Sequence, residues 1–154
     1  MGGAARARHN PFVVTAERSL RIDHVGIAVA DLRAAVAHYQ ERLGVSPEPP
    51  ERVPADGVEA VFFELGSSSV ELLGSVRSDS TVARFLERRG EGLHHLAYQV
   101  LDIEAELARW RHLGAELIDE RPRLGSRGRL VAFLHPRTEG GVLTELCQVA
   151  APLR

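Results

Sequence analysis

Lysine is absent from this chain of 154 residues, and all 19 basic residues are arginines. This absence excludes chemistry that needs a lysine amine, such as Schiff-base formation, and it excludes the phosphate-binding lysine of a P-loop. Cysteine is nearly absent too, because Cys147 is the only one. A single thiol forms no internal disulfide and builds no thiolate metal cluster. We therefore expect a reducing compartment and a cytoplasmic location.

Long apolar runs and an excess of positive charge are also lacking. No segment approaches the roughly 20 apolar residues that a membrane span needs, and we interpret residues 1–18 as a disordered or weakly ordered N-terminal tail. The 21 acidic residues outnumber the 19 basic ones, for a net charge of −2. Binding to nucleic acid normally requires a basic surface. We therefore expect no nucleic-acid partner and no membrane partner.

An internal repeat covers most of the chain. The segment IDHVGIAVADLRAAVAHYQERLG (22–44) returns as LHHLAYQVLDIEAELARWRHLG (93–114). Each copy has the alternation of a strand, then an aspartate that can cap a helix (Asp31 or Asp102), then apolar residues at helical spacing before a glycine. The predicted apolar stripes are Leu32, Val36, Tyr39 and Leu43 in the first helix, and Ile103, Leu107, Trp110 and Leu113 in the second.

Three further candidate strands follow each predicted helix, so each copy predicts a βαβββ module. They cover residues 46–53, 59–65 and 69–73 in the first copy, and 116–120, 130–135 and 142–148 in the second. Neither module has enough apolar surface for its own core. We therefore predict an α+β fold with a single domain at residues 19–150. It consists of module one (19–75), a linker helix (80–90) with Val82, Phe85 and Leu86 turned inward, and module two (92–149).

Strand alternation directs one histidine of each copy to the same face. His24 shares its face with the small residues Gly26 and Ala28, which leaves space for a ligand above it. His95, and not its neighbour His94, occupies the equivalent position in the second copy. The repeat therefore predicts that His24 and His95 face one another.

The last strand of each module adds a carboxylate, because VEL at 70–72 matches TEL at 144–146. If a pseudo-twofold axis relates the modules, His24, Glu71, His95 and Glu145 converge on one point. Such a set suits a borderline divalent ion such as cobalt, nickel, zinc or manganese, with positions left for substrate. The alternative is a pair of hydrogen-bonded core histidines with solvated glutamates. Burying two carboxylates without a cation, however, costs several kcal/mol each.

Longer blocks resemble the methylmalonyl-CoA epimerases, a family of the vicinal oxygen chelate superfamily, from about residue 22 to residue 148. These blocks are DHVGIAVADL, VELL, DSTVARFLERRGEGLHHLAYQV, LIDERPRLGSRG and AFLHPRTEGGVLTEL. The resemblance implies a cup-shaped, partly open barrel of two βαβββ modules, usually a homodimer. It also implies one divalent metal ion per chain, with cobalt preferred, on residues matching His24, Glu71, His95 and Glu145. The repeat selects the same four residues.

The activity that the resemblance implies is interconversion of (2R)- and (2S)-methylmalonyl-CoA through a metal-stabilised enolate. Two acid/base groups on opposite faces would remove and return the α-proton, each typically contributing ~10²- to 10⁴-fold. The resemblance assigns these roles to Glu51 and Glu145, with Glu145 also a metal ligand. An exposed loop carboxylate is the alternative interpretation of Glu51, which lies in the proline-rich segment EPPERVPADGV.

Two other functions stay open. A glyoxalase I type isomerase also moves a proton with such a ligand set, and a small-molecule sequestering protein of the drug-resistance type uses an apolar cleft without metal. The block HPRTEGGVLTEL favours the epimerase over the first alternative. The paired histidines and glutamates argue against the second.

Overall fold

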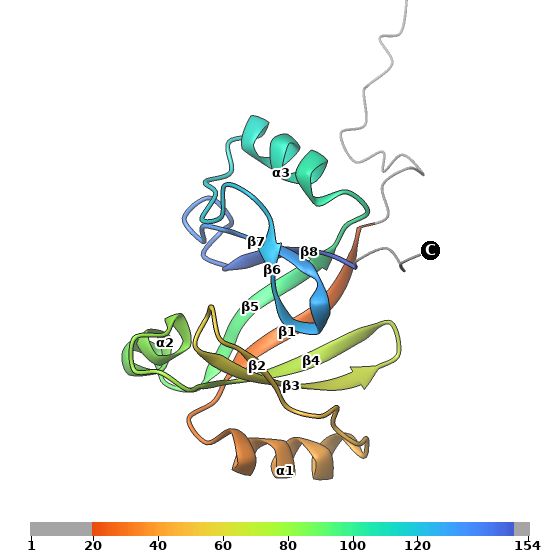
Figure 1. Cartoon of the computed structure of the whole chain (residues 1–154), viewed down its shortest axis with the longest axis vertical. Coiled ribbons are helices and arrows are strands. Elements are labelled where there is room, and N and C mark those ends of the chain that lie inside the picture. The colour runs from red at the N-terminus through yellow and green to blue at the C-terminus, as the bar shows by residue number, and fades with distance from the viewer. Residues whose placement is uncertain (1–19, 150–154) are drawn as a thin grey trace, which may run out of the picture.

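The computed structural model describes residues 20–149, so the tail predicted at residues 1–18 lies outside the described residues. One eight-stranded sheet runs in the order β2-β3-β4-β1-β5-β8-β7-β6 (Figure 1). Its first half holds β1 (Arg21–Ala28), β2 (Glu51–Val53), β3 (Val58–Leu65) and β4 (Ser68–Ser75). Its second half holds β5 (Gly92–Gln99), β6 (Arg123–Leu124), β7 (Leu130–Leu134) and β8 (Thr144–Gln148). The helices are α1 (Leu32–Leu43), α2 (Thr81–Arg89) and α3 (Ile103–His112), with the short 3₁₀ helix η1 (Ser126–Gly128).

The strand order is symmetrical about the β1–β5 pair. In each half the first strand pairs in parallel with the last, β1 with β4 and β5 with β8, while antiparallel pairing of β1 with β5 joins the halves. Figure 1 shows α1 and α3 on the sides of their half-sheets that face away from the space between the halves. The α+β fold of two βαβββ units in a curled, partly open barrel is therefore confirmed.

Apolar stripes attach the helices to the sheet. The predicted α1 stripe packs against Val61, Phe63 and Leu72, which are almost fully buried. Ile103 and Leu107 of α3 pack in the same way on the second half-sheet. The prediction for Leu113 is wrong, since this side chain is 69% exposed. The helix ends at His112, and Leu113 forms its C-cap instead of continuing the stripe.

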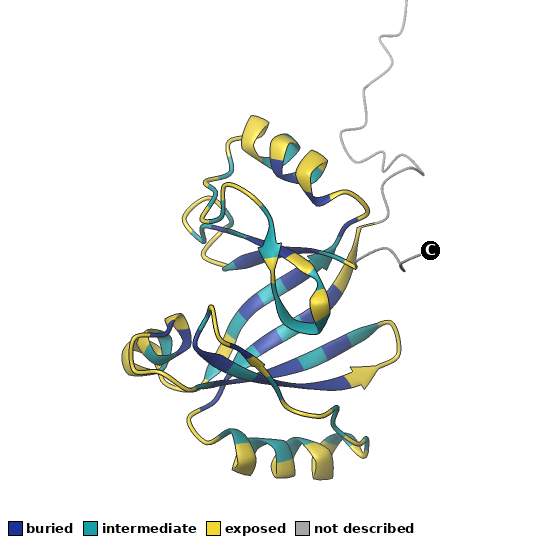
Figure 2. Ribbon diagram, viewed as in Figure 1, coloured by how far each residue is buried: buried dark blue, intermediate teal, exposed yellow. Residues whose placement is uncertain are grey.

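A further apolar cluster lies on the inner face of the first half-sheet. Phe62 and Leu73 pack there with Val82 of α2, while Phe85 and Leu86 cover the edge, as the sequence predicts. Figure 2 shows the buried residues along the central strands and exposed residues on the outward faces of the helices. None of the helices within residues 20–149 has the length and apolar character needed to cross a membrane.

Three predicted strands differ from the structure. Only Glu51–Val53 of the predicted strand 46–53 pairs, because the three prolines before it donate no N–H to a ladder. The predicted strand 116–120 is wrong, since it makes a single bridge between Leu117 and Leu134 and the neighbour of β7 is β6. The side chain of Asp119 accepts the Phe133 N–H there, in place of a main-chain partner. The predicted strand 142–148 begins at Thr144 in the structure, because the residues before it follow a turn.

Candidate active site

Four side chains from four adjacent strands converge inside the curl of the sheet. His24 lies on β1, Glu71 on β4, His95 on β5 and Glu145 on β8, and we call these residues the His–Glu cluster. Gly26 lies opposite both Glu71 and His95. A Cβ atom at Gly26 would lie 2.2 Å from Cε1 of His95, so the glycine provides the space that the imidazole occupies.

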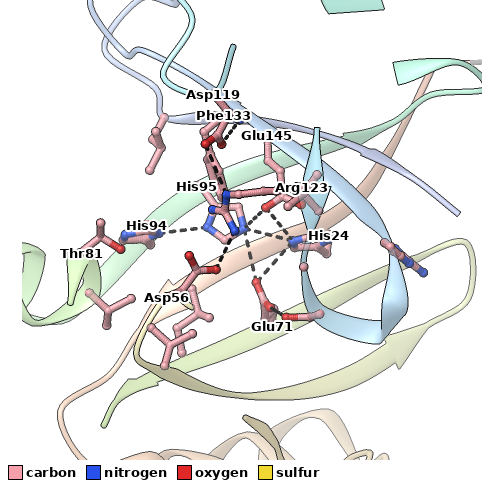
Figure 3. Close-up of a pocket in the computed structure, with 18 of the residues that line it drawn as sticks. His24, Asp56, Glu71, Thr81, His94, His95, Asp119, Arg123, Phe133 and Glu145 are labelled. Carbon is pink, nitrogen blue, oxygen red and sulfur yellow. Dashed lines mark hydrogen bonds and ion pairs between the residues drawn. The ribbon is translucent and has the colours of Figure 1, made fainter. Parts of the chain in front are cut away.

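Ligand atoms of His24, His95 and Glu145 all lie within 4.8 Å of one another, and Glu71 contacts both imidazoles beside them (Figure 3). Nε2 of His24 is 3.0 Å from Nε2 of His95, and Oε2 of Glu71 is 3.3 Å from each. Oε2 of Glu145 is 3.2 Å from Nε2 of His95 and 3.8 Å from Nε2 of His24. Ligands ~2.0–2.2 Å from one metal ion are themselves roughly 3–3.6 Å apart. The four side chains are at most 7% exposed, so His24, His95 and Glu145 form a buried donor set that fits a divalent ion, with the Glu71 carboxylate adjoining it.

Each histidine is held through its second ring nitrogen. His24 Nδ1 donates to Oδ2 of Asp23 at 2.8 Å, and Asp23 also forms an ion pair with Arg129. His95 Nδ1 lies 2.9 Å from Nδ1 of His94. Such contacts fix the ring and direct Nε2 toward the centre, as is usual for metal-binding histidines.

The electrostatics of the cluster require a positive charge at its centre. Burial lowers the pKa of His24, but Asp23 and Glu71 outweigh that effect and raise it to about 10. Burial likewise opposes charge on His95, while Glu145 and Glu71 raise its pKa to about 9. Burial raises the pKa of Glu71, yet its hydrogen bonds to the two imidazoles hold it well below the usual range. Protons on the imidazoles provide the charge at pH 7, and a divalent ion can provide it instead.

Strand alternation does not predict that His94 contacts and orients the ring of His95. Gly26 pairs with His95 and Ile27 with Leu93, so His94 is the extra residue of a β-bulge. The bulge lets His94 line the cavity beside His95. Burial, with the neighbouring His95, lowers the pKa of His94 to about 4, so its ring is neutral. The sequence holds a signal for it, because two histidines are adjacent, but period-two alternation assigns them to opposite faces.

A cavity of about 330 Å³ opens over the cluster. Its walls are mainly apolar, and they include Val58, Phe62, Leu73, Val131 and Phe133. This size is at the lower end for ligand sites. It provides a pocket with apolar walls beside two buried carboxylates.

Polar residues at the cavity join the two halves of the sheet. Arg123 donates to Asp56 at 3.0 Å and to Asp119 at 3.3 Å, and Ser126 donates to Glu71 Oε1 at 3.3 Å. These neighbours and Asp23 are missing from the sequence prediction, because their partners are far along the chain or on an irregular loop.

Glu51 lies apart from the cluster. It pairs with Ala60 on β3, so its side chain shares the inner face of the sheet. Its Oε2 accepts the main-chain N–H of Arg127 at 2.8 Å, and Glu51 is not among the residues that line the cavity. The structure therefore brings four of the five predicted site residues together and leaves Glu51 near the rim.

The sequence and the fold match a known class of proteins. The family model of the glyoxalase/bleomycin resistance protein/dioxygenase superfamily matches residues 23–133. The ethylmalonyl-CoA/methylmalonyl-CoA epimerase of Cereibacter sphaeroides is 40% identical over 131 residues, which are 84% of this chain and 98% of that protein. The human mitochondrial methylmalonyl-CoA epimerase is 38% identical over 83% of this chain and 73% of its own. The chain belongs to this superfamily and, within it, to the methylmalonyl-CoA epimerase family.

A solved structure agrees with this placement. A methylmalonyl-CoA epimerase in complex with methylmalonyl-CoA and NH4⁺ superimposes with a TM-score of 0.82 at 39% identity. The match covers 85% of this chain and 95% of that one.

Proposed function

We propose that this protein is a metal-dependent isomerase that interconverts the two C2 epimers of methylmalonyl-CoA. The observation that carries the proposal is the His–Glu cluster, with two imidazoles and two carboxylates buried at the base of an apolar cavity. The relatives named above support the substrate, since one of them holds methylmalonyl-CoA. An α-proton next to a thioester is a weak acid, so its removal requires a site that stabilises negative charge.

The cluster would hold one divalent ion, and we expect cobalt in preference to nickel, zinc or manganese. When bound, such an ion supplies a Lewis acid that stabilises negative charge on the substrate oxygens. Asp23 and His94 orient the two imidazoles for this purpose. The apolar walls exclude water from the reacting carbon and strengthen the electrostatic interactions at its base.

We assign the two acid/base roles to Glu145 and Glu51. Glu145 would exchange a proton with C2 on one face, because its carboxylate lies at the base of the cavity. Glu51 would act on the opposite face, and to do so it must release the hydrogen bond from Arg127.

Replacement of Glu51 by glutamine tests the second assignment. Glu51→Gln removes the proton acceptor and leaves the cluster intact, so metal content stays unchanged while inversion slows by roughly 100-fold or more. One epimer then exchanges its C2 proton with solvent faster than it inverts. Glu41→Gln on the exposed face of α1 is the matched control. A Glu51→Gln protein with the parent rate would place the second base elsewhere, with Asp56 and Asp119 the cavity-lining candidates.

The two alternatives are tested in one assay. A glyoxalase I type isomerase converts the hemithioacetal of methylglyoxal and glutathione, whereas we expect turnover of methylmalonyl-CoA alone. A sequestering protein would bind ligand without turnover and without metal. Turnover of the hemithioacetal in place of methylmalonyl-CoA would contradict the proposal.

Homodimeric assembly and a cytoplasmic location accompany this function as predictions. Several large apolar side chains are exposed within the described residues, among them Leu113 at 69% and Leu101 at 66%. Burial of such side chains between two copies is a common source of dimer stability. Analytical ultracentrifugation distinguishes the dimer from a monomer of 16.9 kDa.

A further inference from the structure

A second cavity adjoins the one above the His–Glu cluster. Its volume is about 610 Å³. The two cavities share a wall. The residues that line both are Thr81, His94, His95 and Leu143. Figure 3 shows His94 and Thr81 on the side of the cluster that faces α2. The second cavity therefore adjoins the cluster on the side nearest α2.

Three arginines of α2 line this second cavity, Arg84, Arg88 and Arg89. Arg84 donates to the main-chain oxygen of Asp79, and the guanidinium of Arg89 lies over the ring of Phe85 at 5.9 Å. Within residues 20–149 none of the three guanidinium groups forms an ion pair with a carboxylate, and the two contacts above are their only side-chain hydrogen bond and ring contact there.

The three arginines of α2 differ in this respect from arginines near the cavity over the cluster. Arg123, Arg127 and Arg129 all form ion pairs with aspartate or glutamate. Arg84 and Arg88, by contrast, are one helical turn apart, a spacing at which like charges repel. The arrangement leaves a concentration of positive charge on an exposed helix face, where an anionic ligand would relieve the repulsion.

The remaining wall of the second cavity is apolar. Phe85, Leu93 and Val142 contribute to it, and Leu93 and Val142 are 72% and 45% exposed. A ligand that fits both parts carries a mostly uncharged arm and ends in several negative charges. Guanidinium groups recognise phosphate through paired, charge-assisted hydrogen bonds.

We infer that Arg84, Arg88 and Arg89 bind the phosphate groups of a CoA thioester whose acyl end lies at the His–Glu cluster. In this arrangement the pantetheine arm follows the apolar wall formed by Leu93 and Val142. The inference rests on the proposed function for the identity of the acyl group, but not for the recognition of phosphate. It assigns α2 to substrate binding in addition to its packing role through Val82.

The test compares the parent with a triple variant, Arg84→Gln, Arg88→Gln and Arg89→Gln, by calorimetric titration with free CoA. All three side chains are exposed, so we expect the variant to fold, and circular dichroism checks this. Loss of several charge-assisted hydrogen bonds weakens CoA binding by about tenfold or more. The control is Arg33→Gln, Arg42→Gln and Arg121→Gln, which removes the same charge from exposed positions outside the cavity and keeps the parent affinity.

A second measurement compares methylmalonyl-CoA with methylmalonyl-pantetheine, which lacks the nucleotide phosphates. The parent should prefer the CoA thioester in kcat/KM by about tenfold or more, and the triple variant should lose this preference. A parent that does not bind free CoA, or a triple variant that binds it like the parent, would overturn the inference. Arginine-dependent CoA binding without epimerisation would instead reject the proposed function and retain the CoA site for another acyl group.

Discussion

At the scale of single residues, the two repeat-related histidines have different supports. His24 is held by the carboxylate of Asp23, which is itself paired with Arg129 from a loop more than a hundred residues away. His95 is held by the neutral ring of His94, its neighbour in the sequence. Removing a histidine that supplies a ligand atom should therefore lower the metal affinity more than removing the residue that orients this histidine.

Substitution of the two adjacent histidines measures this difference. His95→Ala removes a donor atom from the cluster, so the purified protein should no longer hold a stoichiometric divalent ion. His94→Ala should retain the ion with an affinity about 10–100-fold lower, the usual effect of losing an orienting partner. Elemental analysis and competition with a chelator measure both quantities. Equal loss of metal in the two variants would contradict the assignment of His95 as ligand and His94 as support.

Metal binding should also release protons. The neighbouring carboxylates raise the pKa of His24 to about 10 and the pKa of His95 to about 9, so the pair of rings holds bound protons at pH 7 that must leave when an ion binds. We expect at least one proton released per ion at pH 7, and a metal affinity that rises with pH. Calorimetry in buffers of different ionisation enthalpy counts the protons. Release close to zero would show that the rings are neutral before metal binds.

The repeat predicts all four members of the His–Glu cluster, because equivalent positions in two copies single them out from the other histidines and glutamates. It could not predict Asp23 or His94. Asp23 lies at a β-bulge of β1, between Ile22 and His24, and its ion pair with Arg129 follows from the tertiary fold. His94 reaches the cavity through a β-bulge, which alternation does not reveal.

At the scale of elements, one turn from the second half closes over the first. Arg127 in η1 has φ of 59°, an unfavourable value for a residue with a side chain. Its guanidinium pairs with Glu48 and Glu64 and lies 3.8 Å from the ring centre of Phe62, while its N–H holds Glu51. These contacts stabilise the strained turn and fix the position of the proposed second base.

Substitution of Arg127 tests the role of this turn. Arg127→Ala removes the ion pairs and the ring contact, and we expect the free energy of unfolding to fall by about 1–3 kcal/mol. Urea denaturation followed by circular dichroism measures the change. Arg137→Ala is the control, because the ion pair of Arg137 with Glu116 is on the exposed surface and should contribute less than about 1 kcal/mol. Equal effects of the two substitutions would show that η1 does not depend on Arg127.

The elements themselves follow from the sequence except where side chains replace the main chain as hydrogen-bond partners. Capping aspartates and apolar stripes predict α1 and α3 because both signals are local. The segment 116–120 is predicted as a strand, yet the Asp119 carboxylate accepts the Phe133 N–H and the regular ladder does not form. Prediction of that replacement requires knowledge that the two segments are neighbours.

At the scale of the whole molecule, the candidate site exists because two halves are joined. Each half-sheet provides one histidine and one glutamate, and the β1–β5 pairing brings the four side chains together. The second half also provides Arg129 and Ser126, which contact Asp23 and Glu71 of the first. The repeat predicts this symmetry, and the strand order and pairing have it. The helices α2 and η1 lie outside the repeated segments, so the repeat does not predict which residues they contact.

The most direct test of the central claim follows the C2 proton of methylmalonyl-CoA by NMR in deuterated water, with the metal-loaded protein and after chelation. We predict that the loaded protein replaces the C2 proton with deuterium while it interconverts the epimers. We further predict that removal of the ion, verified by elemental analysis, stops both processes, and that added cobalt restores them. Exchange and inversion at the parent rate in verified metal-free protein would contradict the account.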